Sequence, residues 1–355
     1  MMGEAGKYKL MADSGATKCS WAFVGTDCNA SSRGGAVRFE TAGLNAAVNA
    51  GEAIRQVASE CAAQLSLAAG PSCAFPEPWV GGMCPDGMFA LEGVVGRVAD
   101  IWIYAAGVTS PEAAALVDSV FVGVFPCARV HVASDMLGAA RAACGAEAGI
   151  VGILGTGSNS CFYDGKRIVK QGLGGGYVLG DEGSGAWFGK RLLSDFIRDR
   201  LPQDMTEALR EEYALDYRTI VENVYRADAP SRYLASFFPF ILKWAKPGAE
   251  DVPEDRPVVS TSHLGDRNQT EKNEYAAGLI REGFGAFLDR CIVGRYDSRS
   301  YPLNLCGSVA WFCRDIIAEC AASRGMALGR VVKSPIDSLV DYHSSLPCNA
   351  DSVTR

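Results

Sequence analysis

Residues 149–163 read GIVGILGTGSNSCFY, and this stretch decides the fold. Its two ends are apolar enough to form strands, and between them lies the small polar turn Gly155-Thr156-Gly157-Ser158-Asn159. The same order recurs over residues 8–24, around the turn Asp13-Ser14-Gly15-Ala16-Thr17-Lys18. Two hairpins of one design indicate an internal duplication. Since the backbone N–H groups of such turns form anion-binding concavities, the pair can clasp the phosphates of one nucleotide.

Outside the hairpins, short apolar strands alternate with helical patterns. Further strands are predicted at 38–42, 100–104, 130–132, 167–171, 303–305 and 331–332. Apolar residues at helical spacing predict helices between them, and residues 200–245 read as helical throughout. Two stretches read poorly as regular structure, 70–93 and the polar 246–274, which is predicted to be a surface loop. Strands alternating with helices predict an α/β fold with antiparallel hairpins inserted.

A glycine-rich run follows the second hairpin. Residues Gly172–Gly185 read GLGGGYVLGDEGSG and lead into an apolar helical pattern over 188–197. Such a run suits a place where the backbone turns tightly or approaches a ligand, and helix N-termini attract anions. A flexible loop in which Asp181 and Glu182 are incidental is the alternative.

Single-loop phosphate motifs do not fit this chain. A P-loop needs Lys-Ser or Lys-Thr after its second glycine, but Gly185 is followed by Ala186-Trp187. A dinucleotide fingerprint needs a glycine three residues after Gly157, where Ser160 stands. The hairpin pair therefore remains the candidate for phosphate binding, and two plain hairpin turns are the alternative.

Bulk properties narrow the function classes. The 355 residues suffice for two domains, and 48% hydrophobic with 21% charged residues is ordinary for a globular protein. A net charge of −7 argues against nucleic acid or an anionic membrane as partner. No apolar run has the length of a membrane span, and no signal-peptide core begins the chain. Thirteen cysteines without a Cys-x-x-Cys pair favour free thiols in a reducing cytoplasm, and three scattered histidines make a zinc site unexpected.

Four motifs together resemble a known family. Asp13–Lys18, Gly155–Ser158, Gly180-Asp-Glu-Gly-Ser184 and Gly307-Ser-Val-Ala310 are similar to those of the BadF/BadG/BcrA/BcrD-type ATPases, closest to the N-acetylglucosamine kinase branch. That branch belongs to the actin/hexokinase/Hsp70-like superfamily. The resemblance covers both halves of the chain and is silent over about 50–100 and 200–300. It implies two ribonuclease-H-like domains with ATP and substrate in a cleft between them.

The resemblance also implies domain boundaries. The first domain is expected over 1–133 and the second over 134–334, with 246–274 as a surface loop of the second. A helix at 335–345 is expected to pack back on the first domain.

ATP and Mg²⁺ are the implied cofactors. The implied ATP-binding residues are Gly15, Ala16, Thr17, Lys18, Gly155, Thr156, Gly157, Ser158, Gly307 and Ser308. Asp13 is expected near the magnesium ion, through water. A turn-capping carboxylate is the alternative for Asp13, since Asp favours such turns.

Sugar phosphorylation is the implied reaction, with Asp135 as the base that takes the proton from the attacking hydroxyl. The implied substrate-binding residues are Asn45, Gly107, Asp135, Gly176 and Asp181. Two of these have an alternative, because Ser134-Asp135 suits a helix N-cap and Asn45 can also cap a helix.

N-acetylglucosamine, phosphorylated at its 6-hydroxyl, is the expected small-molecule substrate. The chain departs from the family at Ala105, where the family has glycine, and at Gly175, where animal N-acetylglucosamine kinases have tryptophan. The second departure leaves the identity of the sugar open. A homodimer is one state that the resemblance allows.

Two other functions compete with this one. An ATPase that activates a CoA dehydratase would need cluster cysteines, but no cysteine motif stands beside Cys161. A catalytically silent sugar- or nucleotide-binding regulator is disfavoured by the presence of Asp13, Asp135 and Asp181.

Overall fold

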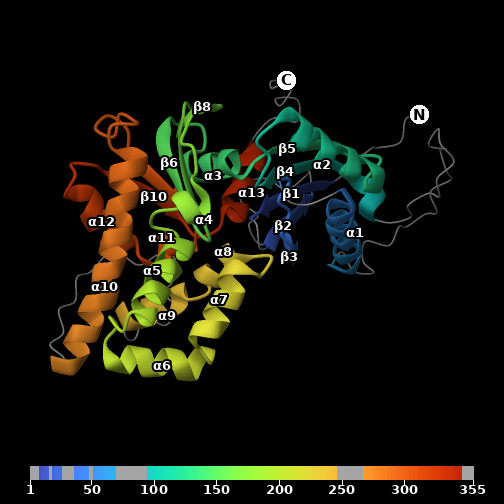
Figure 1. Ribbon diagram of the computed structural model, residues 1–355. Coiled ribbons are helices and arrows are strands. Elements are labelled where there is room, and N and C mark those ends of the chain that lie inside the picture. The colour runs from blue at the N-terminus through green and yellow to red at the C-terminus, as the bar shows by residue number, and fades with distance from the viewer. Residues whose placement is uncertain are drawn as a thin grey trace, which may run out of the picture. The chain divides into compact units, whose positions relative to one another are not determined.

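The computed structural model describes residues 8–15, 18–25, 36–47, 51–68, 94–245 and 267–345. The chain forms two compact units (Figure 1). Unit 1 comprises Met1–Gly145 and Pro335–Arg355, and unit 2 comprises Ala146–Ser334. This boundary lies after the predicted one at 133/134, because helix α3 (Asp135–Cys144) packs within unit 1, on strand β4 (Val98–Ala105) and on helix α13 (Pro335–Ser345).

Unit 1 is built on a five-stranded mixed sheet. In spatial order its strands are β3 (Val37–Ala42), β2 (Lys18–Gly25), β1 (Tyr8–Ser14), β4 and β5 (Arg129–Ser134). The first three are antiparallel neighbours, whereas β1, β4 and β5 run parallel. The carboxyl ends of the parallel strands therefore meet at one edge, where α/β sheets commonly bind ligands.

Both faces of this sheet are covered by helices. Successive residues of a strand point to opposite faces. Accordingly Leu10 packs in the cluster with helices α1 (Gly51–Ala68) and α2 (Pro111–Val124), and Met11 in the cluster beneath α3 and α13. A short 3-10 helix (Val94–Arg97) precedes β4.

Unit 2 repeats the same sheet. Its spatial order is β8 (Ile168–Gln171), β7 (Ser158–Tyr163), β6 (Gly149–Leu154), β9 (Leu303–Cys306) and β10 (Leu328–Val332). Again an antiparallel trio is followed by two parallel strands. The predicted α/β fold with duplicated domains is confirmed, and both units have the topology of actin-like ATPase domains.

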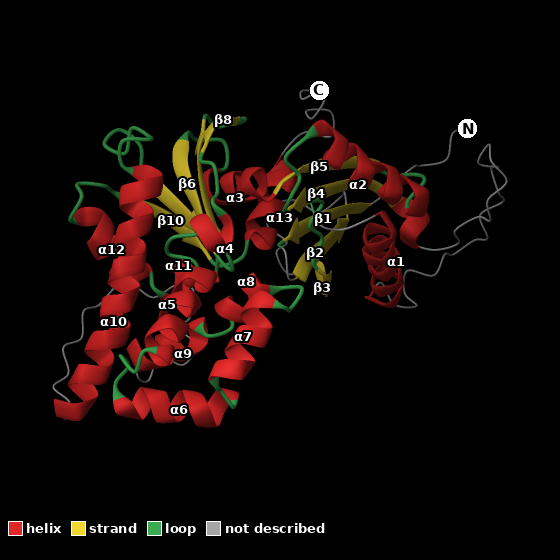
Figure 2. Cartoon of the chain, in the orientation of Figure 1, coloured by secondary structure: helices red, strands yellow, loops and turns green. Residues whose placement is uncertain are grey.

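A large helical insertion distinguishes unit 2 from unit 1 (Figure 2). Between β8 and β9 lie α4 (Gly176–Leu179), α5 (Gly185–Ile197), α6 (Gln203–Tyr213), α7 (Tyr217–Tyr225), α8 (Pro230–Ala235), α9 (Phe238–Ala245), α10 (Arg267–Phe287) and the π-helical turn η4 (Leu288–Ile292). Two further helices, α11 (Ser308–Phe312) and α12 (Arg314–Ala322), flank the parallel strands.

Residues 200–245 are helical, as predicted, and form four helices, since Ala214 turns left-handed after α6 and Pro230 starts α8. The predicted loop ends earlier than 274, because Arg267 already begins α10. Helices α11 and α12 are separated at Cys313.

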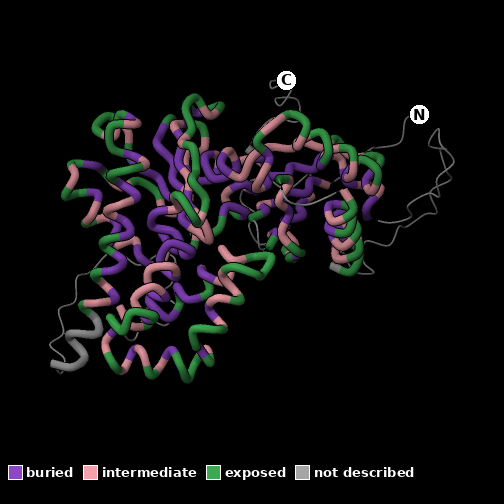
Figure 3. The backbone as a smooth tube through the Cα atoms, viewed as in Figure 1, coloured by how far each residue is buried: buried purple, intermediate pink, exposed green. Residues whose placement is uncertain are grey.

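The core of unit 2 centres on α5 (Figure 3). The Phe188 ring is fully buried. Its centroid lies 5.4 Å from the ring centroid of Phe238 and 5.7 Å from that of Phe284. Burial of such a ring stabilises a fold by roughly 1.5–3 kcal/mol. Helix α5 is thereby fixed between α9 and α10, and its N-terminus is held beside β6. Within the described ranges, no helix has the length and apolarity needed to cross a membrane.

Candidate active site

The turn after β6 is fixed by the N-terminus of α5. The amide N–H of Gly155 donates to the carbonyl oxygen of Gly157 (3.0 Å), which closes the turn. Gly185 N–H donates to the Gly155 carbonyl (2.8 Å), and Ala186 N–H donates to the Thr156 carbonyl (3.0 Å). Ser158 already belongs to β7. Hydrogen bonds within the turn and to the N-terminus of α5 thus hold the predicted phosphate turn in one conformation.

Gly307 brings a distant part of the chain against this turn. Its φ is +119°, a backbone conformation that favours glycine, and a Cβ there would overlap the carbonyl oxygen of Leu154. Its N–H donates to the Val332 carbonyl (2.9 Å), and Ser308 begins α11 directly afterwards. Gly307 and Ser308, two of the predicted ATP-binding residues, therefore lie against the end of β6.

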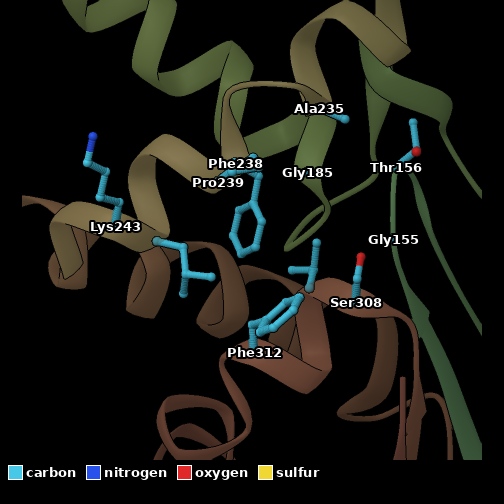
Figure 4. Close-up of a pocket in the computed structure, with 11 residues that line it drawn as sticks. Gly155, Thr156, Gly185, Ala235, Phe238, Pro239, Lys243, Ser308 and Phe312 are labelled. Carbon is cyan, nitrogen blue, oxygen red and sulfur yellow. The ribbon is translucent and has the colours of Figure 1, made fainter. Parts of the chain in front are cut away.

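A groove of about 470 Å³ lies between these segments (Figure 4). It is lined by Gly155, Thr156, Gly185, Ala235, Phe238, Pro239, Leu242, Lys243, Ser308, Val309 and Phe312. In Figure 4 the rings of Phe238 and Phe312 face the same space from α9 and α11. Ligand sites are of this size, with mainly apolar walls and a few polar groups, here the hydroxyls of Thr156 and Ser308.

Sequence reasoning missed the α8 and α9 side of the groove. Ala235, Phe238 and Lys243 come from the stretch on which the resemblance is silent. The apolar face of α9 was the only signal, and it predicts core packing equally well. Lys243 also forms an ion pair with Glu212 (3.3 Å).

Asp13 lies in unit 1 at the end of β1, inside the strand and not in the turn where the sequence put it. Its backbone pairs with Ser20 on β2 and Tyr104 on β4. Burial raises the pKa of Asp13 to about 7, and the charge of Asp135 adds to this, while Lys18 opposes it. The two carboxylates are thus close enough to repel each other.

Asp135 is the first residue of α3. The N-cap is Ser134, whose Oγ accepts from the Leu137 N–H (3.3 Å), so the capping alternative for Asp135 is wrong. The Oδ1 atom of Asp135 accepts from the N–H of Met136 (2.8 Å). Burial raises the pKa of Asp135, and this hydrogen bond partly offsets the increase.

Asn45 and Gly107 lie in contact. Asn45 forms an isolated parallel bridge with Ala106, and its Oδ1 accepts from the Ala47 N–H (3.1 Å). Gly107 has a φ of +76°, and a Cβ there would overlap Asn45 Oδ1. Since α1 begins only at Gly51, Asn45 does not cap that helix.

One edge of the unit 1 sheet therefore gathers several of the predicted residues. The Ser14 hydroxyl accepts from the Leu44 N–H (2.7 Å), and the Ser14 carbonyl accepts from the Ala106 N–H (2.9 Å). Ala105 pairs with Ser134 on β5. These contacts bring the segments that carry Asp13, Asn45, Gly107 and Asp135 together at the carboxyl ends of β1, β4 and β5.

Asp181 lies in unit 2, and its carboxylate contacts the predicted phosphate turn. Its Oδ1 accepts from the Ser158 N–H (3.2 Å), and a Cβ on Gly157 would lie 3.0 Å from its Oδ2. Burial raises the pKa of Asp181; the Ser158 N–H opposes this and the charge of Glu182 adds to it. Gly176 begins α4 with a φ of +62°, and its carbonyl accepts from the Gly180 N–H (2.9 Å).

The cavity beside Asp181 is small. About 30 Å³ is enclosed between β7, the run 172–175, Asp181 and Arg295.

Some predicted residues lie outside the described part of the chain. These are Ala16 and Thr17, the excursion 70–93, and residues 246–266. On either side of the first turn, Gly15 N–H donates to the Lys18 carbonyl (3.1 Å), and Lys18 pairs with Glu40 (2.6 Å). Among the described residues, no group of three or more His, Cys, Asp or Glu could hold a metal ion.

Comparisons with known proteins agree with this architecture. No protein-family model matches the sequence, and no curated protein does either. A solved structure from Porphyromonas gingivalis, named "Putative N-acetylglucosamine Kinase", is 31% identical, with a TM-score of 0.73 over 94% of this chain and 98% of that one. A protein of the same name from Chromobacterium violaceum is 18% identical, with a TM-score of 0.64 over 96% and 99%.

A third match shows how widely this fold is used. The MamK double helical filament is 13% identical, with a TM-score of 0.52 over 96% of this chain and 99% of that chain. The second and third likenesses concern the fold alone, because one fold hosts unrelated functions. The first is closer and spans nearly the whole of both chains. The chain belongs to the family of that Porphyromonas gingivalis protein, within the actin/hexokinase-like superfamily of ATPases.

Proposed function

We propose that this protein is an ATP-dependent sugar kinase, and that its substrate is an amino sugar, N-acetylglucosamine phosphorylated at the 6-hydroxyl. The observation that carries the proposal is the groove in unit 2, where two distant predicted nucleotide segments, Gly155-Thr156 and Ser308, line one space with Phe238 and Phe312. The similarity to the Porphyromonas gingivalis protein supports the amino sugar. The motifs described above support the N-acetylglucosamine kinase-like branch of the BadF/BadG/BcrA/BcrD-type ATPases.

Unit 2 would bind the nucleotide. The base of ATP would lie between the rings of Phe238 and Phe312, which favour a flat aromatic ligand. The turn Gly155–Ser158 would hold phosphates through the N–H groups of Thr156 and Gly157, since consecutive N–H groups attract anions. The N–H groups of Gly155 and Ser158 already donate to Gly157 and Asp181. The rigidity that α5 gives this turn supports the assignment, because positioning is most of what phosphoryl transfer requires.

Unit 1 fits a magnesium ion near Asp13. Burial and the charge of Asp135 both raise the pKa of Asp13, and a divalent cation would stabilise its charged form against both effects. Hard oxygen ligands of this kind suit Mg²⁺. When bound, Mg²⁺ neutralises charge on the transferred phosphoryl group.

Each unit carries residues that the resemblance assigns to the sugar. Asn45 with Gly107, and Asp181 with Gly176, supply amide, carboxylate and backbone groups that suit a hydroxyl-rich ligand. Asp135 takes the proton of the attacking hydroxyl, while the oxygen forms its bond to phosphorus and ADP leaves. A raised pKa suits this task, because a general base works best when its pKa lies near the operating pH.

A coupled ADP-release assay over amino sugars and plain hexoses tests this function. N-acetylglucosamine should stimulate ADP release, and Asp135→Asn should lower kcat by about 10²–10⁴-fold. Asp118→Asn, an acid on α2 of the same unit, is the matched control and should keep wild-type turnover. If no sugar stimulates ADP release, the kinase assignment is wrong, and an undiminished Asp135→Asn rate removes Asp135 from its role.

A further inference from the structure

Glu182 has no role in the site as described so far, although it stands next to Asp181. Its carboxylate is buried, with 9% of the side chain exposed. The Oε1 atom accepts from Arg290 Nη1 (2.9 Å), and Oε2 faces the thiol of Cys291 (3.9 Å). Burial and the neighbouring Glu182 raise the pKa of Cys291 to about 11, so this thiol keeps its proton and can donate it.

Both partners of Glu182 come from the π-helical turn η4 at the end of α10. Such wide turns are rare and frequently mark functional sites. This one is tied to the sheet, because Ser160 Oγ donates to the carbonyl oxygen of Cys291 (3.2 Å). It therefore provides a fixed anchor, connected to β7, from which Arg290 reaches Glu182.

The backbone at Asp181 needs such an anchor. Its φ of +56° lies in the left-handed region, which a residue other than glycine occupies only when its surroundings hold it there. On one side the N–H of Ser184 donates to the Asp181 carbonyl (3.1 Å). Next to it Gly183 sits so close to α10 that a Cβ would lie 3.2 Å from the Gly283 carbonyl oxygen. Glu182 is the side chain that binds this strained segment to η4.

We propose that Glu182 and Arg290 are positioning residues that hold the Asp181 carboxylate in its sugar-binding orientation. The pair fixes the backbone at 181–182, so the carboxylate of Asp181 stays on the N–H of Ser158 and against Gly157. This inference rests on the proposed sugar kinase function and assigns residues that the sugar does not touch.

Stability alone does not account for the pair. The Arg290 side chain is 70% exposed, and ion pairs with an exposed partner add little to folding. Burying the Glu182 carboxylate is itself costly. The neighbouring Asp289, also on η4, offers a comparison, because it forms two hydrogen bonds with Arg324 (2.6 and 2.8 Å) and neither of them involves Glu182.

Kinetics of matched variants separate positioning from plain structure. Arg290→Gln and Glu182→Gln should each raise the sugar KM about fivefold or more and leave the ATP KM within about twofold, since only ground-state sugar contacts weaken. Arg290→Lys should restore part of the loss, and the double variant should be no worse than either single one. Arg324→Gln should keep the wild-type sugar KM. An unchanged sugar KM in Arg290→Gln overturns the proposal, and so does an equal rise in Arg324→Gln.

Hydrogen exchange measures the same effect without turnover. The amides of Ser158 and Ser184 donate to Asp181, so Arg290→Gln should speed their exchange about tenfold, and Arg324→Gln should not. A wild-type protein without sugar-stimulated ADP release would overturn the kinase function and, with it, the sugar role of Asp181. Wild-type turnover combined with unchanged exchange in Arg290→Gln would overturn the positioning role alone.

Discussion

The backbones of Gly175 and Gly180 pack directly against each other. A Cβ on Gly175 would lie 2.7 Å from the amide nitrogen of Gly180, and a Cβ on Gly180 would lie 2.9 Å from the Gly175 Cα. The four residues of α4 thus form a closed loop with glycine at both ends. The tryptophan that animal N-acetylglucosamine kinases carry at the Gly175 position does not fit here, which gives the departure from the family a steric cause.

This contact predicts that Gly175→Ala is destabilising. The methyl group would push α4 away from Gly180 and disturb the segment leading to Asp181, at a cost of about 1–3 kcal/mol. Gly174→Ala is the matched control, because a Cβ there meets only the Ser158 carbonyl at 3.9 Å. Thermal unfolding of the two variants should show a lower Tm for Gly175→Ala alone. Equal Tm values would mean that the Gly175–Gly180 contact is not tight.

Gly107→Ala should weaken sugar binding. Its methyl group would displace the Asn45 amide and strain a backbone with φ +76°. We expect the sugar KM to rise about tenfold, the equivalent of ~1.4 kcal/mol, without a change in ATP binding. Gly123→Ala on α2, where a Cβ meets nothing within 4 Å, should leave both KM values unchanged. A sugar KM that does not move would remove Asn45 and Gly107 from the binding site.

The raised pKa of Asp13 predicts how stability depends on pH in metal-free buffer. The folded protein holds this proton up to about pH 7, whereas the unfolded chain releases it near the ordinary value of 3.8. The unfolding free energy should therefore fall by roughly 2–4 kcal/mol as pH rises through this window. Asp13→Asn should match wild type at low pH and be more stable at pH 8, as measured by urea unfolding at a series of pH values.

Asp164 provides a control, because its effect on the unfolding free energy should change with pH in the opposite direction. Hydrogen bonds from the backbone N–H groups of Arg167 and Lys166 lower its pKa. Asp164→Asn should therefore lose stability only above the ordinary carboxyl pKa, where the charged form makes these bonds. The Asp13 interpretation fails if Asp13→Asn shows the same trend as Asp164→Asn.

Removing one wall of the groove should weaken nucleotide binding. Phe312→Ala should raise the Kd for a fluorescent ATP analogue about 10–100-fold, since stacking of a base on an aromatic ring contributes ~1–3 kcal/mol. Phe162→Ala is the control, because the Phe162 ring packs on the ring of Tyr301, with 4.8 Å between the ring centroids, and does not line the groove. A similar loss in both variants would indicate damage to the unit rather than to the site.

The fold could be predicted from sequence because its signals are local. The turns at Asp13–Lys18 and Gly155–Ser158 show the duplication within a few residues each, and the strands around them are short apolar runs. The position of Asp13 was less predictable: pairing with β2 and β4 extends β1 through Ser14, and pairing between strands is a tertiary effect.

The candidate site could be predicted only in part. Glycines and acids at turns can be recognised by their local chemistry, but the α9 wall cannot. Phe238 is an apolar residue of an amphipathic helix, and only the packing of α9 beside α11 makes it part of a groove. The link between Arg290 and Glu182 is equally hidden, since it depends on a π-helical turn far along the sequence.

The return of α13 to unit 1 has a consequence for synthesis on the ribosome. Ile336, Leu339 and Val340 are buried with Met11 and Trp102 on one face of the first sheet. Domains generally fold from the N-terminus as they emerge. Here the first unit to be translated is the last to be completed, because one face of its sheet is covered only in part, by α3, until α13 has left the exit tunnel. Unit 2, formed from one continuous segment, can finish first, so a chain that stalls before residue 335 exposes an apolar face that chaperones would recognise.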